Sequence, residues 1–425
     1  MTVRPCLRKL ILAPYTPTRE QLAELGDVLT EGEPGAYYLL EDPEGFSPPL
    51  VLPVPIAVLI SLMDGQRSLE EIAEKLQEMM GSAPSLEELQ NIVEHMDGLH
   101  FLDSPAFEKF LQEEKDAFQQ RPTRAAVAGG AYERGPKELE IQLRAALALP
   151  GKIRQAEGLG QGPLFSSKIQ AVLVPHLDIE RGAAAYGWAY QALAEQAPLE
   201  TVIIFGTSHN PMSERFALTA KGFETPLGVL RTDGEWIVRL TEKCAANLFV
   251  DEFLHRDEHS IELQTLFLKY LEIQQQKEIR IVPILVNSFA PFLKEGDPAT
   301  DPEISAMVKA LREMLAERRR VTILAAADLS HVGPIYGEAE PVNDAMRDAV
   351  RENDRQLISV MTACDAAAFW NAIVQNQNRY NNCGIAPIYM ALRLCEGGRG
   401  ERLNYEQSVD ETGSCVSFAT VVFGS

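Results

Sequence analysis

The sequence lacks the paired cysteines of disulfide-rich and zinc-binding proteins, and it lacks the excess of basic charge that is typical of nucleic-acid-binding proteins. Its six cysteines form no Cys-X-X-Cys pair, which argues against a disulfide scaffold and against a four-cysteine zinc site. Acidic residues outnumber basic ones by 61 to 39, giving a formal net charge of −22. Such a chain repels phosphate backbones, and no long basic patch offsets this charge, so we expect no nucleic-acid partner.

Long apolar runs are also missing. No apolar segment approaches the ~20 residues needed to cross a bilayer. The longest one, residues 51–63, is interrupted by prolines. The first 17 residues have a basic head but only a short apolar patch and no small-residue cleavage site, so a signal peptide is not expected. We therefore expect a cytoplasmic protein without a membrane partner.

The motifs of four large enzyme classes do not occur. The chain has no Gly-X-Ser-X-Gly nucleophile elbow, no phosphate-binding GxxxxGK[ST] loop, no HExxH zinc motif and no GxGxxG after a strand. What remains is a set of seven histidines, which is few for 425 residues. Their positions become the main guide to chemistry.

The length favours two domains, since single cores seldom exceed ~300 residues. We assign residues 1–118 to a small α+β domain of winged-helix type. Residues 37–40 and 49–54 flank a turn and predict a β-hairpin, and three short helices follow. Two of these helices open with a Ser and a Glu three residues later, which is the capping-box signature. The last of them, over residues 85–97, contains four acidic residues and no Lys or Arg, so it should avoid DNA.

We assign residues 119–425 to an α/β domain. A linker over residues 117–165 contains an amphipathic helix, and buried strand patterns then alternate with helical patterns. Continuous Val/Ile/Leu runs alternating with helices predict a mostly parallel sheet flanked by helices. The predicted elements are strands at 168–175, 201–209, 279–287 and 321–331, helices at 182–196, 261–274 and 304–319, a hairpin at 215–228 and a closing strand pair at 403–410 and 414–424.

Three histidines stand at the ends of predicted strands, namely His176, His209 and His331, and His259 opens a helix. The carboxyl ends of parallel strands share one crevice, so residues far apart in sequence can meet there. Neutral imidazoles are common ligands of transition metals. His176 and His209 are therefore our candidate metal ligands, and His259 is a candidate pocket residue. Charge at a helix start is the alternative explanation for the acidic residues before His259.

A third ligand is available in Cys383, which follows Asn-Asn and precedes a predicted helix. A helix N-terminus lowers a thiol pKa and favours the thiolate, which binds metals or attacks electrophiles. A buried small residue is the alternative for Cys383. Asp328 and His331 lie three apart on the turn that leaves a strand, so Asp328 could ligate or orient and His331 could transfer protons. Helix capping is the alternative for Asp328. The other histidines, His95, His100 and His255, are interpreted as surface or packing residues.

Seven motifs in order resemble the Memo family, known in bacteria and archaea as protein B of the AmmeMemoRadiSam system: PHLD, FGTSHN, ETPLGVLRTD, DEHSIELQ, VPILV, AADLSHVG and NCGIAPI. The resemblance runs from about Arg124 to the C-terminal end. It implies the fold of class III extradiol dioxygenases, with non-haem Fe(II) at the strand ends.

Carried over residue by residue, the resemblance places the metal ligands at His176, His209 and Cys383. It matches Asp328 and His331 to the family's pocket pair, with His331 as the acid–base histidine and Asp328 orienting it. His259 matches the family's Glu-His-Ser motif. One departure is clear: after Pro-His this chain has Leu177, Asp178 and Ile179, where the common family pattern is Ala-Gly-Tyr. Asp178 could be an additional ligand or could pair with Arg181.

Residues 40–107 resemble the PqqD-like family of peptide-recognition domains, which implies a peptide or partner protein bound to the first domain. Oligomerisation or packing is the alternative there. The Memo resemblance implies a radical SAM protein and an AMMECR1-like protein as partners. Our leading hypothesis is a metal-dependent oxidoreductase, with Fe(II) as the metal and Cu or Zn as alternatives. A metal- or cysteine-dependent hydrolase and a binding module with a vestigial site are the competing hypotheses.

Overall fold

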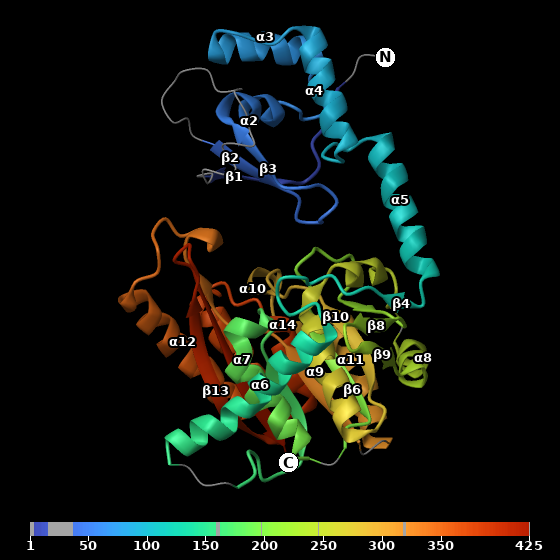
Figure 1. The fold of residues 1–425 in the computed structure, drawn as a ribbon, viewed down its shortest axis with the longest axis vertical. Helices are drawn as coiled ribbons and strands as arrows, with labels where there is room; N and C mark the ends of the chain where they lie inside the picture. Colours follow the sequence, from blue (N-terminus) through green and yellow to red (C-terminus); the bar gives the residue numbers. More distant parts are fainter. Residues whose placement is uncertain are drawn as a thin grey trace. The chain divides into compact units, whose positions relative to one another are not determined.

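The computed structural model describes residues 4–15, 37–158, 162–196, 198–244, 246–317 and 320–424. The chain forms two compact units, Met1–Gln120 and Arg121–Ser425. Figure 1 shows both, with the first unit in blue to cyan. The boundary that we drew at residue 118 falls inside the last turn of the helix Pro105–Gln120. None of the helices in these described ranges has the length and apolar character to span a membrane.

The first unit combines a three-stranded antiparallel sheet, in the order β1-β2-β3, with helices around an apolar core. Its strands are β1 Ile11–Tyr15, β2 Tyr37–Glu41 and β3 Leu50–Pro53, and its helices are α2 Val54–Ser61, α3 Leu69–Met80, α4 Leu86–Gly98 and α5 Pro105–Gln120. The predicted hairpin is confirmed as β2 and β3.

Both predicted capping boxes are also confirmed. The Ser68 hydroxyl accepts a hydrogen bond from the Glu71 backbone N–H, and the Glu71 carboxylate accepts one from the Ser68 N–H. Ser85 and Glu88 repeat the arrangement at the start of α4. Each box satisfies two N–H groups that a helix end leaves without intrahelical partners.

The second unit contains a large sheet whose central strands are parallel. Its strand order along the main path is β12-β14-β5-β11-β6-β10-β9-β8-β4, with β13 paired to β14 and β7 to β10. Neighbouring strands from β5 to β9 in this order are parallel. The strands are β4 Thr123–Arg124, β5 Ile169–Val174, β6 Thr201–Thr207, β7 Phe216–Leu218, β8 Gly222–Thr225, β9 Gly228–Thr232, β10 Arg280–Val286, β11 Val321–Ala326, β12 His331–Val332, β13 Arg399–Val409 and β14 Cys415–Gly424.

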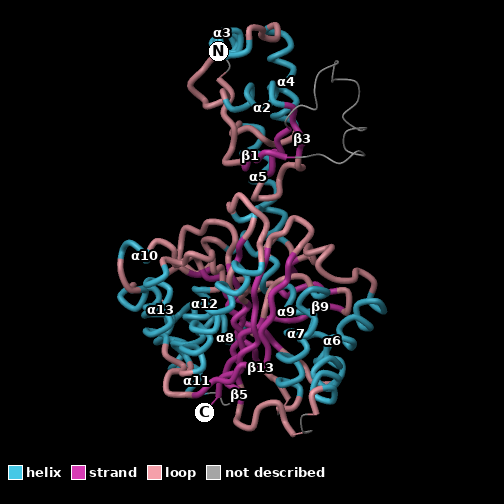
Figure 2. The backbone as a smooth tube through the Cα atoms, turned by 90° about the vertical axis from the view of Figure 1, so that its left-hand side faces the viewer, coloured by secondary structure: helices cyan, strands magenta, loops and turns pink. Residues whose placement is uncertain are grey.

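Helices cover both faces of this sheet, which Figure 2 shows with helices on either side of the strands. Alternate residues of β5 belong to different cores: Leu173 packs in one with α8, α11, α12, α13 and α14, and Val172 packs in the other with α6, α7 and α9. The helices are α6 Pro136–Ala156, α7 Ile179–Ala194, α8 Gly234–Lys243, α9 His259–Gln275, α10 Phe292–Glu295, α11 Pro302–Glu317, α12 Asp344–Thr362, α13 Ala366–Asn376 and α14 Ile385–Leu394. The predicted α/β class and the mostly parallel sheet flanked by helices are confirmed.

Two local predictions were wrong. The segment that we interpreted as a linker contributes β4, α6 and the fully buried Leu139 and Leu143 to the core of the second unit. The hairpin lies between β8 and β9 and not between β7 and β8, because β7 pairs with β10. Gly228, at φ +115°, provides the turn with a backbone conformation that other residues rarely adopt.

Candidate functional site

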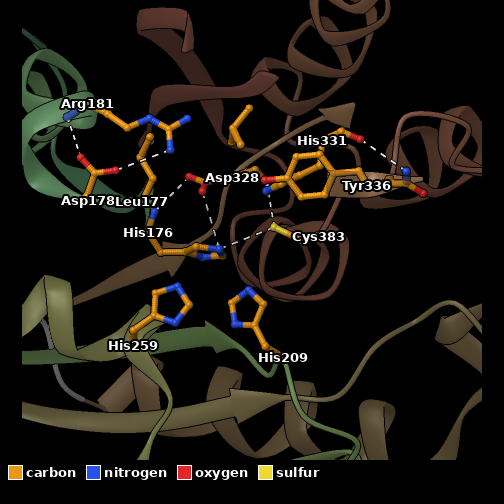
Figure 3. A pocket seen from close by; sticks show the side chains of 12 residues that line it. His176, Leu177, Asp178, Arg181, His209, His259, Asp328, His331, Tyr336 and Cys383 are labelled. Atoms are coloured by element: carbon orange, nitrogen blue, oxygen red, sulfur yellow. Dashed lines mark hydrogen bonds and ion pairs between the residues drawn. The ribbon is translucent and has the colours of Figure 1, made fainter. Parts of the chain in front are cut away.

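Three imidazoles meet at the carboxyl end of the parallel strands (Figure 3). His176 follows β5, His209 follows β6 and His259 is the first residue of α9. Their ring centroids are 5.1 Å apart for His176 and His209, 5.5 Å for His176 and His259, and 4.7 Å for His209 and His259. One nitrogen from each ring lies within 4.8 Å of the other two, so this set could hold a metal ion.

His176 is fixed by hydrogen bonds on its ring and on its backbone. Its Nδ1 lies 3.0 Å from the Ala326 carbonyl oxygen, to which it can only donate, so Nε2 keeps its lone pair. Its backbone N–H donates to Asp328 Oδ1 at 3.0 Å. Burial lowers the pKa of His176 to about 4. The ring is therefore neutral at physiological pH, the form that binds metals.

Glu258 fixes His209 in the same way. The carboxylate accepts hydrogen bonds from the His209 backbone N–H at 2.9 Å and from its Nδ1 at 3.0 Å, and it also accepts one from the Ser260 N–H at 2.8 Å. This arrangement leaves His209 Nε2 as the available lone pair. A carboxylate behind a ligand histidine is the usual support of metal sites.

The charges of these groups depend on one another. Burial opposes ionisation of Glu258, yet the charges of His209 and His259 hold the pKa of its carboxyl well below the usual range. Partial desolvation in the cavity lowers the pKa of His209, but the Glu258 carboxylate outweighs this effect and raises it overall. For His259 burial dominates and lowers the pKa to about 4. The sequence led us to interpret Glu258 only as charge at a helix start, and its position next to a candidate ligand was the signal that we did not use.

Cys383 lies beside the imidazole set but outside it. Its Sγ is 3.6 Å from His176 Nε2 and 3.9 Å from the Asp328 carbonyl oxygen. Burial and the Asp328 carboxylate raise the pKa of the Cys383 thiol well above its usual value. The expected lowering by the α14 N-terminus is therefore wrong for these surroundings, because desolvation of the thiolate outweighs the helix dipole.

Asp328 and His331 line the same cavity, although Asp328 does not hold His331. The Asp328 side chain accepts from the His176 N–H, and its Oδ2 lies 3.7 Å from His176 Nε2. His331 Nδ1 instead contacts the Leu329 carbonyl oxygen at 3.1 Å. The segment after Asp328 is β12 and not a helix, so the capping alternative is wrong. Burial raises the pKa of Asp328 and lowers that of His331.

A buried network holds the turn that carries these two residues. The Asp354 carboxylate accepts hydrogen bonds from Ser330 Oγ at 2.6 Å, Ser417 Oγ at 2.5 Å and Tyr405 OH at 3.0 Å. Ser330 lies between Asp328 and His331 in the chain. The network therefore connects the turn to α12, β13 and β14.

The cavity onto which the imidazoles, Asp328 and Cys383 open has a volume of about 420 Å³. Asp178 lies at its edge, where it caps α7 by accepting from the Arg181 N–H at 2.9 Å, and its Oδ2 is 3.6 Å from Arg181 Nη1. Of the two roles that we considered for Asp178, the structure shows the pairing with Arg181. The cavity is lined by His176, Leu177, Asp178, Arg181, His209, His259, Asp328, His331, Tyr336, Asn381, Cys383 and Val416.

Comparison with known proteins identifies the relatives of this chain. A family model described as Memo-like protein matches residues 123–422. A MEMO1 family protein of Aquifex aeolicus is 26% identical over 394 residues, covering 92% of this chain and 96% of that protein. A MEMO1 family protein of Thermus thermophilus is 28% identical over 363 residues, covering 85% of this chain and 100% of that protein. The chain therefore belongs to the Memo-like family, as its seven ordered motifs predict.

Proposed function

We propose that this protein is a metal-dependent oxidoreductase whose metal ion is bound by His176, His209 and a third side chain. The observation that carries the proposal is the set of three imidazoles whose ligand atoms lie within 4.8 Å of one another. In His176 and His209, Nδ1 donates a hydrogen bond to an oxygen acceptor, so Nε2 is available to a metal. The α/β fold with a site at the strand ends agrees with the expected likeness to extradiol dioxygenases.

The third ligand is His259 or Cys383. His259 belongs to the set of converging nitrogens, whereas the Cys383 thiol contacts His176 from the other side. Three imidazoles suit Fe, Cu or Zn, and a thiolate in place of one imidazole shifts the preference toward Cu or Zn. We keep Fe(II) as the leading metal and Cu or Zn as alternatives.

A bound metal would supply a Lewis acid or an electron-transfer centre. The chain's own residues would hold the ligand histidines in place and accept or donate protons. Asp328 and Glu258 hold the backbone of His176 and His209 in place, and Glu258 also holds the His209 ring. His331 presents Nε2, since Nδ1 faces the Leu329 carbonyl, and the lowered pKa favours a neutral ring that can accept a proton.

The proposal is tested by loading the full chain with Fe(II), Zn(II) or Co(II) under anaerobic conditions and counting bound metal. We expect one ion per chain. A thiolate-to-cobalt charge-transfer band that disappears in Cys383→Ser would identify Cys383 as the third ligand, and unchanged cobalt spectra in that variant would favour His259. Absence of stoichiometric metal with all three ions would overturn the proposal.

Glu258 provides a sharper test of the site. Because it fixes the His209 ring, Glu258→Ala should weaken metal binding about 10- to 100-fold. Glu258→Gln keeps an acceptor oxygen and should lose less. Competition with a chelator of known affinity measures the effect. Glu180→Ala, which changes an exposed acid in the first turn of α7, is the matched control and should bind metal as the wild type does. Equal affinity in Glu258→Ala and wild type would exclude the supporting role.

A cysteine-dependent hydrolase is the competing function. It requires a reactive thiolate, and the raised pKa of the Cys383 thiol disfavours this form. This argument applies to the cysteine-dependent hydrolase alone, since a metal-dependent hydrolase would use the same imidazole site as the proposed oxidoreductase.

A second proposal concerns partners of the first unit. Its sheet ends in β1 on one side and β3 on the other, and an added peptide strand could pair with such an outer strand. Ile11 on β1 is half exposed, which fits a surface that a partner covers. A peptide or partner protein on a PqqD-like winged-helix unit, a radical SAM protein and an AMMECR1-like protein remain our proposed partners.

A further inference from the structure

Arg181 gives the cavity a fixed cation. It is the one Arg or Lys among the described residues that line the cavity. Figure 3 shows it beside Asp178 and apart from the imidazoles of His209 and His259. Its side chain is 31% exposed, so a molecule in the cavity can reach it.

The Arg181 guanidinium is held in place but retains donors. Its Nε donates to Ser408 Oγ at 2.9 Å and its Nη2 to the Ser408 carbonyl oxygen at 3.4 Å. Nη1 lies 3.6 Å from Asp178 Oδ2, which is too long for a direct hydrogen bond. A guanidinium carries five N–H donors in a planar fork that matches a carboxylate, so this one is prepared to bind an anion.

An apolar surface also borders the cavity. Leu177 and Val416 belong to one small buried cluster, and Tyr336 packs against it. All three line the cavity together with Arg181 and the imidazoles. A ligand that fills this space would therefore place an apolar body against these side chains.

We propose that the cavity binds a small carboxylate whose anionic group pairs with Arg181 and whose apolar body packs on Leu177, Val416 and Tyr336. Its other end faces the imidazoles, so this inference rests on the proposed metal site. Asp178 and Asp410, whose charges both interact with that of Arg181, compete with the ligand and limit its affinity.

The proposal is tested with two probes that share a metal-binding group. Benzohydroxamate and 4-carboxybenzohydroxamate differ by one carboxylate, and calorimetry on the zinc-loaded full chain measures both affinities. We expect wild type to bind the carboxylated probe about tenfold more tightly than benzohydroxamate, because one charge-assisted hydrogen bond contributes about that difference in affinity. Arg181→Gln should lose this preference and still bind benzohydroxamate normally. Equal affinity of wild type for both probes would overturn the proposal.

A second variant changes the affinity in the opposite direction. Asp178→Asn keeps a good N-cap for α7 but removes one of the charges that compete for Arg181, so the carboxylated probe should bind more tightly than to wild type. A merely structural Arg181 predicts no such gain, and unchanged binding in Asp178→Asn would count against the proposal. Arg355→Gln, on the surface of α12, is the control and should leave both affinities unchanged.

The metal-free protein separates this proposal from the metal site. Benzoate titrated into it tests the arginine contact alone. Saturable binding by wild type that is lost in Arg181→Gln supports the carboxylate site even if no metal is retained. Metal retention with equal benzoate binding by wild type and Arg181→Gln would preserve the proposed function and reject the carboxylate site.

Discussion

His209→Ala is expected to weaken metal binding roughly 100- to 1,000-fold. Structural zinc sites with four protein ligands have apparent binding free energies of about 10–16 kcal/mol, so one ligand accounts for about 2.5–4 kcal/mol if they share equally. Each 1.4 kcal/mol corresponds to a factor of ten in affinity. Chelator competition on the full chain measures the change.

The fold should tolerate this substitution. The His209 side chain is 40% exposed, and Glu258 keeps its hydrogen bonds to the backbone N–H groups of residues 209 and 260. His95→Ala, on an exposed position of α4, is the control and should not change the affinity. Wild-type metal affinity in His209→Ala would remove His209 from the ligand set and with it the proposed centre.

Glu262→Ala should lower the free energy of unfolding by about 3–5 kcal/mol, since it removes one partner of a buried ion pair. Arg124 and Glu262 are in contact and both side chains are completely buried. Glu262 also accepts from the Val127 N–H at 3.1 Å, the Ala128 N–H at 3.0 Å and the Tyr132 hydroxyl at 2.5 Å. Alanine would leave the Arg124 charge and these donors without their acceptor. Urea denaturation followed by circular dichroism measures the loss.

A double variant separates charge from packing. Replacing both partners, as Arg124→Met with Glu262→Leu, removes the uncompensated charge and should destabilise less than Glu262→Ala alone. Arg351→Ala breaks an exposed pair with Asp348 and should cost less than about 1 kcal/mol. A Glu262→Ala variant as stable as this control would contradict the assigned role of the pair.

This ion pair also supports the site. Arg124 Nη2 donates to the Glu258 carbonyl oxygen at 2.7 Å, and its Nε donates to that of His255 at 2.8 Å. The segment that carries Glu258 and His259 is therefore anchored to β4, although 134 positions separate Arg124 from Glu258 in the sequence. Variants at Arg124 should be examined for metal affinity as well as stability.

The sequence alone predicted the elements that depend on local pattern. Continuous apolar runs identified β5, β6, β10 and β11 and the mostly parallel sheet, because strands buried on both faces require such runs. Ser–Glu spacing identified the capping boxes of α3 and α4. Because the ends of parallel strands share a crevice, the sequence also predicted that His176 and His209 lie at one edge of the sheet.

Tertiary structure decided which groups act together and what charge they hold. His259 has a ligand atom within 4.8 Å of those of two other histidines, the Glu258 carboxylate accepts from His209, and Arg124 contacts Glu262. No regular spacing in the sequence connects the residues of these contacts. The raised pKa of the Cys383 thiol likewise follows from burial, which overrides the local helix dipole. Periodicity and caps are properties of neighbouring residues, whereas desolvation and ion pairing depend on which distant segments the fold places in contact.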